Sequence, residues 1–222
     1  MASPPREGVI QFEMRHRTQA LDERAFGDTV RALSAWRGIL AHLRVLGMDP
    51  ARYEGLGYGN VSSRVGPFGD VARGRRRFLV TGTQTGGIAY TTLREYCLVE
   101  EWDVDANRVA SSGLVAPSSE SLTHAALYDA SPAIRAVLHV HAPELWRRAR
   151  ALGLPVTDEA AANGTPAMAR AVARLYREGT FASTRLAAMG GHEDGVIAFG
   201  VSAEEAGGAL VRHLARAMAM AG

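Results

Sequence analysis

The stretch IRAVLHVH, residues 134–141, decides the fold of this chain. It is dense in Ile, Val and Leu, which is typical of a buried strand. Because residues two apart on a strand project from the same face, His139 and His141 are expected to lie side by side at its end. Two imidazoles so placed can chelate one cation. A pair of hydrogen-bonded histidines with a structural role is the alternative that this stretch leaves open.

Working outward from this strand, the sequence contains further short strands and longer helices. Strands are expected at residues 60–65, 78–81, 96–102, 108–111, 185–189 and 196–199. Helices are expected at residues 26–46, 118–129, 142–152, 165–177 and 202–219. Gly and Pro turns separate the strands that precede residue 134, which favours antiparallel pairing. The pattern predicts an α/β fold, a three-layer α/β/α sandwich around a central, largely antiparallel sheet.

Length and composition set the domain organisation. The 222 residues are enough for one self-sufficient core. Residues 1–20 are polar, include two adjacent prolines and show no period, so they are predicted to form a flexible N-terminal arm, and residues 21–222 a single domain. No apolar run is long enough for a membrane span or a secretory signal. With a single cysteine, Cys97, no intrachain disulfide can form, and a cytoplasmic location is expected.

The positive charges are all arginine. The sequence has 25 Lys plus Arg, none of them lysine, against 23 Asp plus Glu. The absence of lysine excludes an enzyme Schiff base, a pyridoxal-phosphate anchor and a P-loop lysine. Any carbonyl chemistry would therefore need another electrophile, such as a metal ion. The near balance of charges gives no reason to expect a nucleic-acid partner.

Two other segments carry groups that suit such chemistry. Glu120 follows Ser118 and Ser119 at a predicted helix start, where hydroxyls and backbone N–H groups favour an anion. His192 lies in GGHEDG, residues 190–195, between two predicted strands. An ordinary helix start and an exposed loop histidine are the alternatives for these segments. Together with residues 139 and 141, however, they supply three imidazoles and one carboxylate, the set that an open catalytic metal site requires.

The order of several motifs carries a resemblance. The chain contains GYGNVSSR, TQTGGIAY, PSSESLTHAALY, AVLHVHAPELW, NGTPAMA and GHEDGVIAFG, followed by a helix beginning SAEEA. This succession resembles the class II aldolase and adducin head family over roughly residues 30–218. The family includes sugar-phosphate aldolases, an epimerase, a dehydratase and the non-enzymatic head of adducin.

The resemblance implies a role for several residues. His139, His141 and His192 match the family's metal ligands, and Glu120 matches its catalytic acid/base. The groups that match the family's substrate-phosphate site are Asn60, Thr85, Gly86, Ser118 and Ser119. A divalent metal ion, with zinc expected, a small-molecule substrate and a homotetramer are also implied.

The function that follows is a metal-dependent aldolase-type lyase. It would cleave or rearrange a small hydroxycarbonyl compound, expected to be a sugar phosphate, through a metal-stabilised enediolate. An epimerase, a dehydratase or a decarboxylase of the same family, or a non-catalytic adducin-like binding domain, are the alternatives.

Two departures from the family pattern affect the site. Glu193 and Asp194 stand between His192 and the glycine that usually follows it, so either the histidine bulges back to the metal or one of these carboxylates shares its role. The stretch LPVTDEAAANGTP, residues 154–166, contains no tyrosine, although the family's aldolases use one there as proton donor. Metal-assisted enolisation is therefore better supported than aldol cleavage.

Overall fold

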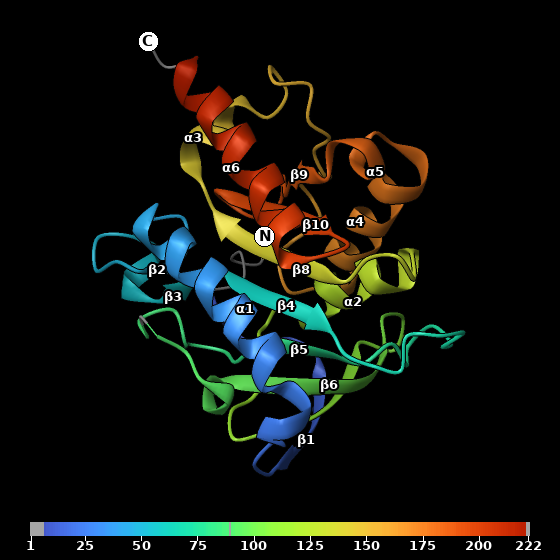
Figure 1. The fold of residues 1–222 in the computed structure, drawn as a ribbon. Coiled ribbons are helices and arrows are strands. Elements are labelled where there is room, and N and C mark those ends of the chain that lie inside the picture. The colour runs from blue at the N-terminus through green and yellow to red at the C-terminus, as the bar shows by residue number, and fades with distance from the viewer. Residues whose placement is uncertain (1–6, 89, 221–222) are drawn as a thin grey trace.

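A sheet of eight strands forms the centre of the computed structural model, which describes residues 7–88 and 90–220 (Figure 1). Its strand order is β1-β7-β6-β5-β4-β8-β10-β9. The strands are β1 (Glu13–Thr18), β4 (Asn60–Arg64), β5 (Phe78–Thr81), β6 (Tyr96–Asp103), β7 (Arg108–Gly113), β8 (Ala136–His141), β9 (Leu186–Ala188) and β10 (Gly195–Gly200). Only β1 and β7 pair in parallel, so the predicted, largely antiparallel sheet is confirmed.

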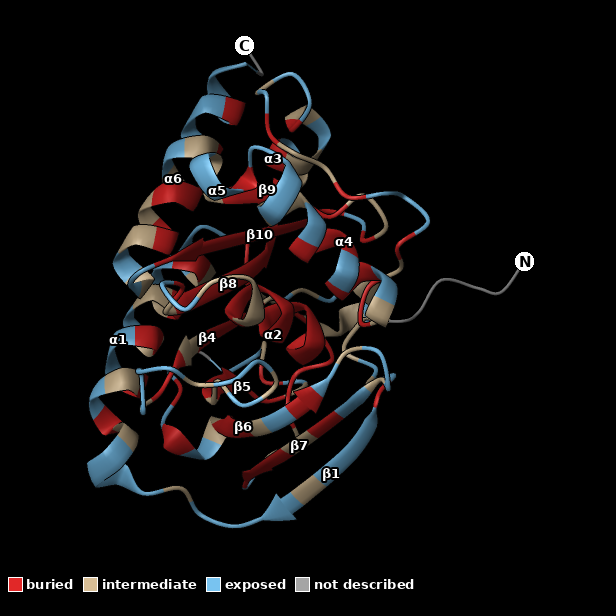
Figure 2. Ribbon diagram, turned by 90° about the vertical axis from the view of Figure 1, so that its right-hand side faces the viewer, coloured by how far each residue is buried: buried red, intermediate tan, exposed pale blue. Residues whose placement is uncertain are grey.

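Helices cover both faces of this sheet. They are α1 (Glu23–His42), α2 (Ser121–Ala130), α3 (Pro143–Arg148), α4 (Pro166–Glu178), α5 (Phe181–Thr184) and α6 (Ala203–Ala219). Two 3-10 turns, η1 (Tyr53–Gly55) and η2 (Leu93–Glu95), and a small β2 (Gly47–Met48) to β3 (Gly57–Tyr58) ribbon complete the described elements. The helices α1, α3 and α6 pack on one face and α2, α4 and α5 on the other. Figure 2 shows α1 and α6 on one side of the sheet and α2 and α4 on the other. The three-layer sandwich is therefore confirmed.

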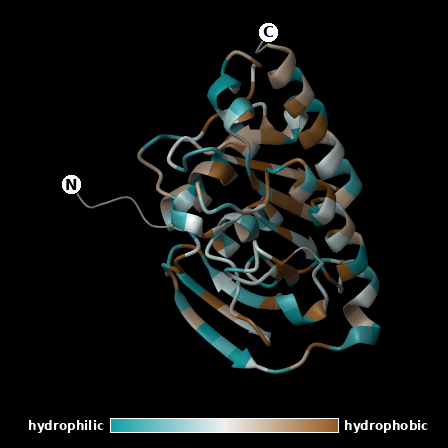
Figure 3. Ribbon diagram, turned by 90° about the vertical axis from the view of Figure 1, so that its left-hand side faces the viewer, coloured by the Kyte–Doolittle hydropathy of each residue, from teal (hydrophilic) through white to brown (hydrophobic). Residues whose placement is uncertain are grey.

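Strand alternation assigns side chains to the two layers. In β8, Val137 packs in the core beneath α2 and α4, whereas Leu138 and Val140 pack in the core beneath α1 and α6. Both faces of this strand are buried, which explains why it is continuously apolar in sequence. Apolar central strands and hydrophilic outer helix turns are visible in Figure 3. His139 and His141 share the parity of Val137 and so face the α2 layer.

Helix starts agree with the sequence in two places and differ in one. Ser202 accepts a hydrogen bond from the Glu205 N–H at the start of α6, as predicted. Thr165 caps α4 in the same way, accepting from the Met168 N–H. The helix predicted from residue 118 begins later, at Ser121, and its cap position is Glu120, whose side chain makes no capping bond. The helix starts later because Ser118 and its neighbours form a turn that holds the Glu120 carboxylate inside.

Part of the predicted N-terminal arm lies in the sheet. Glu13–Thr18 forms β1 at the sheet edge, beside β7, and residues 1–6 of the predicted arm lie outside the described residues. Five of the six β1 side chains are exposed, so the strand has no buried periodicity that sequence could reveal. Backbone pairing, together with the hydrogen bond between His16 Nδ1 and Ser111 Oγ, holds it in place.

No helix among the described residues has both the length and the hydropathy of a membrane-spanning segment. Cys97 is fully buried in β6, where burial raises the pKa of its thiol to about 12. It is therefore a packing residue at neutral pH.

Candidate metal and catalytic site

Two of the three candidate histidines come from the end of β8. Their ring centroids are 5.1 Å apart, and both side chains are completely buried. His139 Nδ1 lies 3.1 Å from the Val196 carbonyl oxygen on the neighbouring strand β10, and since a carbonyl can only accept, this nitrogen carries the proton. The lone pair of His139 Nε2 is then free to bind a cation.

His192 joins this pair from a tight turn between β9 and β10. The turn is closed by hydrogen bonds from the His192 N–H to the Met189 carbonyl and from the Gly195 N–H to the His192 carbonyl. A side chain at Gly191 would come within 2.0 Å of the Ala161 carbonyl oxygen, so only glycine permits this close approach. The His192 ring lies 4.9 Å from that of His139 and 4.6 Å from that of His141.

The two extra residues of this loop point elsewhere. Glu193 is exposed, and Asp194 accepts a 2.7 Å hydrogen bond from the Tyr53 hydroxyl. Asp194 adopts a left-handed conformation with φ of 60°, which absorbs the additional length. Of the two arrangements that the sequence left open, the structure has the one in which His192 itself turns back to the histidine pair.

Glu120 enters the site from the start of α2. Its side chain is 1 % exposed, and its Oε2 accepts a 2.6 Å hydrogen bond from the Thr123 hydroxyl. The other oxygen, Oε1, lies 3.7 Å from His192 Nδ1 and has no hydrogen-bond partner among the described residues. Burial raises the pKa of Glu120, opposed by the charge of His192 and the Thr123 hydrogen bond. This carboxyl group is therefore suited to gaining and losing a proton.

The donor set fits a divalent metal ion. His139 Nε2, both ring nitrogens of His141 and His192 Nδ1 are buried and lack hydrogen-bond partners among the described residues. Such orphaned polar atoms are costly unless they bind something. Burial lowers the pKa values of His139 and His141 well below the ordinary value, which keeps both rings in the neutral form that binds metals. Burial also lowers the pKa of His192, but Glu7 and Glu120 outweigh it and the net shift is upward.

A fourth donor was missed by the sequence analysis. The Glu7 carboxylate lies 2.9 Å from His192 Nε2 and 3.5 Å from His141 Nε2, and its side chain is 10 % exposed. Donor atoms of Glu7 and the three histidines all lie within 4.8 Å of one another. No periodicity or motif marks Glu7, because it stands alone in an irregular segment far from the histidines in sequence. Only the folded chain brings it to them.

The sequence also gave no sign that two tyrosine rings lie beside His141. The Tyr53 ring lies 4.5 Å from the His141 ring, edge to face, and Tyr58 lies 5.5 Å from it. The Arg52 guanidinium stacks over both tyrosine rings at 4.9 and 4.7 Å. Burial and the hydrogen bond to Asp194 raise the pKa of Tyr53, so its hydroxyl keeps its proton at neutral pH. These residues fix one side of the histidine cluster.

The five residues matched to a substrate phosphate come from three neighbouring segments. Asn60 pairs in register with His139, on the same sheet face, and its Oδ1 lacks a hydrogen-bond partner among the described residues. The loop that holds Thr85 and Gly86 follows β5 and is joined to the segment before α2 by the Thr83 N–H to Ala116 carbonyl hydrogen bond.

Ser118 and Ser119, the other two residues of this group, are buried directly before Glu120. Ser118 Oγ accepts a hydrogen bond from the Glu120 N–H, and Ser119 is 4 % exposed. Thr85 Oγ1 already donates to the Gly82 carbonyl, and Gly86 presses against Gly57, leaving no room for a side chain. The group therefore offers hydroxyls, an amide and backbone N–H groups, but no lysine.

A buried arginine side chain supports the loop that holds Thr85 and Gly86. The Arg37 guanidinium, on α1, is 2 % exposed and donates to the carbonyl oxygens of Thr85, Gly86 and Ile88. Burial lowers the pKa of Arg37, although an arginine still carries its charge at neutral pH. In the sequence this residue is hidden within an apolar helical stripe. Its contacts give it a positioning role for the loop.

His124 lies on α2 and is a buried hydrogen-bonding residue outside the histidine cluster. Its Nδ1 and the Tyr128 hydroxyl each lie 2.7 Å from Ser62 Oγ on β4. Burial, with no charged partner, lowers the pKa of His124 to about 3. The residue is therefore neutral in the folded chain at neutral pH.

This histidine predicts a loss of stability in acid. Unfolded His124 takes up a proton near pH 6.5, whereas the folded chain resists protonation down to about pH 3. Its contribution is thus fully present above pH 6.5, and below that the free energy of unfolding should fall by about 1.4 kcal/mol per pH unit. Urea unfolding at pH 7, 6 and 5 should show a shallower dependence in His124→Gln. The exposed His42→Gln serves as control, and equal slopes in all three proteins would contradict the prediction.

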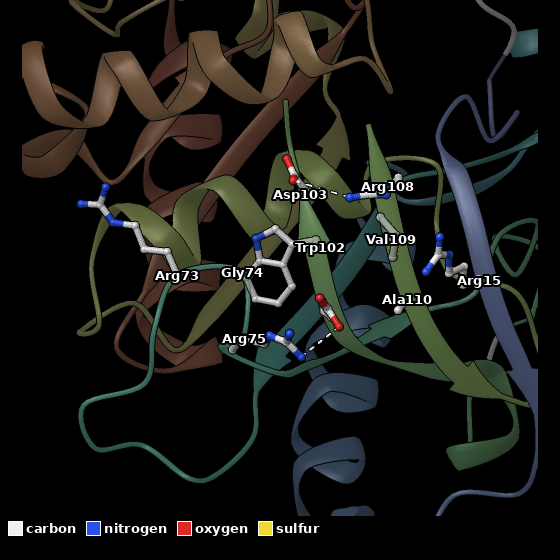
Figure 4. Close-up of a pocket in the computed structure, with 10 residues that line it drawn as sticks. Arg15, Arg73, Gly74, Arg75, Trp102, Asp103, Arg108, Val109 and Ala110 are labelled. Atoms are coloured by element: carbon white, nitrogen blue, oxygen red, sulfur yellow. Dashed lines mark ion pairs between the residues drawn. The ribbon is translucent and has the colours of Figure 1, made fainter. Parts of the chain in front are cut away.

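A second charged hollow lies away from the histidines, at the β6–β7 hairpin (Figure 4). Arg75 pairs with Glu101 at 2.9 Å and Arg108 with Asp103 at 3.9 Å. Arg15 and Arg73 also line this hollow, which lies on an exposed surface where such ion pairs contribute little to stability.

The comparisons with known proteins identify the family and the fold. The description "Class II Aldolase and Adducin N-terminal domain" belongs to the family profile that matches residues 46–220. A search of the curated proteins found no significant match.

Several solved structures share the fold. L-fuculose-1-phosphate aldolase from Thermus thermophilus is 18 % identical with a TM-score of 0.62, covering 87 % of this chain and 93 % of that one. A sugar-phosphate aldolase from Thermotoga maritima is 16 % identical with a TM-score of 0.66, covering 88 % and 94 %. YgbL from Klebsiella pneumoniae, described as a putative aldolase, epimerase or decarboxylase, is 18 % identical with a TM-score of 0.61, covering 87 % and 88 %. Since the family profile spans most of the sequence, the chain belongs to the class II aldolase and adducin N-terminal domain family.

Proposed function

We propose that this chain is a divalent-metal-dependent lyase that enolises a small hydroxycarbonyl compound, with zinc as the metal and a sugar phosphate as the substrate. His139, His141 and His192 would hold the metal, and Glu120 would be the catalytic acid/base. Asn60, Thr85, Gly86, Ser118 and Ser119 would hold the substrate phosphate.

One observation carries the proposal: buried, unpartnered imidazole nitrogens converge within reach of an unpartnered carboxylate oxygen among the described residues. A structural cluster would pair these atoms with one another or with the backbone. Membership of the family and the likeness to sugar-phosphate aldolases support the same chemistry.

The chain's own residues supply the proton transfer. When bound, a divalent cation would polarise the substrate's carbonyl and stabilise the enediolate, the role that a lysine Schiff base plays in other aldolases. Glu120 Oε1 would take the proton from the carbon next to that carbonyl and return it later. Thr123 holds Oε2 at 2.6 Å, which leaves Oε1 as the oxygen that faces the substrate.

Enolisation is the step common to the reactions considered. Residues 154–166 contain no tyrosine, and the Tyr53 hydroxyl beside His141 donates to Asp194. Cleavage of a carbon–carbon bond would therefore need a proton donor from elsewhere, whereas metal-assisted enolisation needs no proton-transfer group other than Glu120. The enediolate is therefore the intermediate that these residues support, and cleavage, epimerisation, dehydration and decarboxylation are the reactions that could follow it.

We also propose that the protein is a homo-oligomer, a tetramer as in its family. Apolar side chains are exposed together along α1 and the segment after the Thr85–Gly86 loop, namely Ile39, Leu43 and Tyr90. A contiguous apolar surface of this kind favours burial against another copy of the chain.

The test is exchange of carbon-bound hydrogen in D₂O, followed by proton NMR. Dihydroxyacetone phosphate, a small phosphorylated hydroxyketone, and a panel of ketose phosphates are the probes. We expect exchange with zinc-loaded protein, a loss of at least about 100-fold after chelation and recovery when zinc is restored. Stoichiometric metal without exchange on any probe would contradict the enzyme proposal and favour the non-catalytic, adducin-like binding domain.

A further inference from the structure

The segment before β1 brings Glu7 to the histidine cluster and is fixed at several points. The Gly8 carbonyl accepts a 2.7 Å hydrogen bond from Thr83 Oγ1, beside the loop of Thr85 and Gly86. Gly8 has a φ of +69°, a left-handed conformation that favours glycine. This tight, left-handed turn places Glu7 over the cluster.

The other end of the segment is held as firmly. Phe12 is buried in the core beneath α2 and α4. The Asn107 side-chain amide donates to the Gln11 carbonyl, and the Glu13 N–H donates to the Asn107 carbonyl. Since both ends are anchored, the place of the Glu7 carboxylate follows from the fold rather than from one surface contact.

The position of this carboxylate has the dimensions of a metal ligand. In a tetrahedral site with bonds of about 2.0–2.1 Å, neighbouring donor atoms lie about 3.3 Å apart. Glu7 Oε2 accepts a 2.9 Å hydrogen bond from His192 Nε2 and lies 3.5 Å from His141 Nε2, on either side of that spacing. Nε2 is therefore the nitrogen of each ring that could share a metal ion with Glu7, and His192 Nδ1 is the nitrogen that faces Glu120. Glu7 is also the only carboxylate in this four-residue set, so it would partly neutralise the charge of a bound dication.

We propose that Glu7 is the fourth ligand of the metal site and that it closes the coordination position needed by a substrate oxygen. The proposal rests on the metal site of the proposed function. Three histidines and one carboxylate complete a tetrahedron, whereas a catalytic site keeps one position for substrate. The substrate's carbonyl or hydroxyl oxygen must then displace the Glu7 carboxylate to bind.

The test uses Co²⁺ alone, in the full chain, so that no substrate or activity is needed. Chelator competition gives the affinity, and visible absorption reports the donor set. Glu7→Ala should bind Co²⁺ at least about tenfold more weakly than the native protein, with an altered spectrum. Glu13→Gln, which changes an exposed glutamate of the same segment, is the matched control and should match the native protein in both readings.

Acetate provides the decisive measurement. Added to cobalt-loaded Glu7→Ala, it should restore the native spectrum, because it returns a carboxylate to the position that Glu7 leaves; a merely structural role of Glu7 would give no such rescue. Native affinity and spectrum in Glu7→Ala would overturn this proposal and leave the three-histidine site intact. Absence of Co²⁺ binding by the native protein would instead overturn the metal site itself, and the Glu7 proposal with it.

Discussion

Replacing Glu120 with glutamine is expected to slow hydrogen exchange of the substrate by about 10²–10⁴-fold, the usual contribution of a general acid/base. The amide keeps the size of the side chain and an oxygen for the Thr123 hydroxyl to bind, but it cannot take a proton at neutral pH. Because Glu120 lies outside the group of four residues that can share one metal ion, metal content should stay unchanged. Metal analysis together with the D₂O exchange assay checks both parts.

The control for Glu120 is Glu193→Gln. Glu193 is the exposed carboxylate next to His192, so it tests whether any nearby loss of negative charge has the same effect. Exchange should remain at the native rate in this variant. Equal losses in both variants, or native exchange in Glu120→Gln, would show that Glu120 is not the acid/base.

Replacing His139 with alanine should weaken metal binding by at least about 100-fold. Loss of a residue that only hydrogen-bonds to a metal ligand weakens binding by about 10–100-fold, and loss of a ligand itself should have a larger effect. His139 is completely buried and its proton is committed to the Val196 carbonyl, so no other described side chain is in place to substitute for Nε2. His192→Ala, in the loop, should have the same effect without altering the sheet. Metal content after dialysis, measured by atomic absorption, checks these expectations.

Thermal unfolding gives a second reading of the same prediction. A ligand present at about 100 times its dissociation constant stabilises the folded state by about 2.7 kcal/mol. Zinc should therefore raise the Tm of the native protein and leave those of His139→Ala and His192→Ala unchanged. His124→Ala removes an equally buried histidine that lies outside the cluster, so it should retain metal and the zinc-induced shift. Loss of metal only in His139→Ala would assign the third ligand to a residue other than His192.

Regular elements with buried faces could be predicted from sequence. The strand at 78–81 and the helix at 202–219 agree closely with β5 and α6, because a short run of buried residues marks β5 and periodic burial with a capping residue marks α6. Elements without a buried periodicity could not be predicted: β1 is almost wholly exposed, and α5 spans only Phe181–Thr184. Their positions depend on backbone pairing and packing with segments far away in the chain.

The sequence alone determined the α/β class, the pairing of His139 with His141 on one face of a strand, and the absence of any lysine nucleophile. These follow from the two-residue repeat of a strand and from composition, which are local or additive properties. Only the tertiary structure decided that His192 rather than Asp194 meets the pair, and that Glu7 lies beside them. The approach of Gly191 to the Ala161 carbonyl and the anchoring of Gly8 by Thr83 fix these two outcomes. Both contacts join residues distant in sequence, so they exist only when the layers have packed.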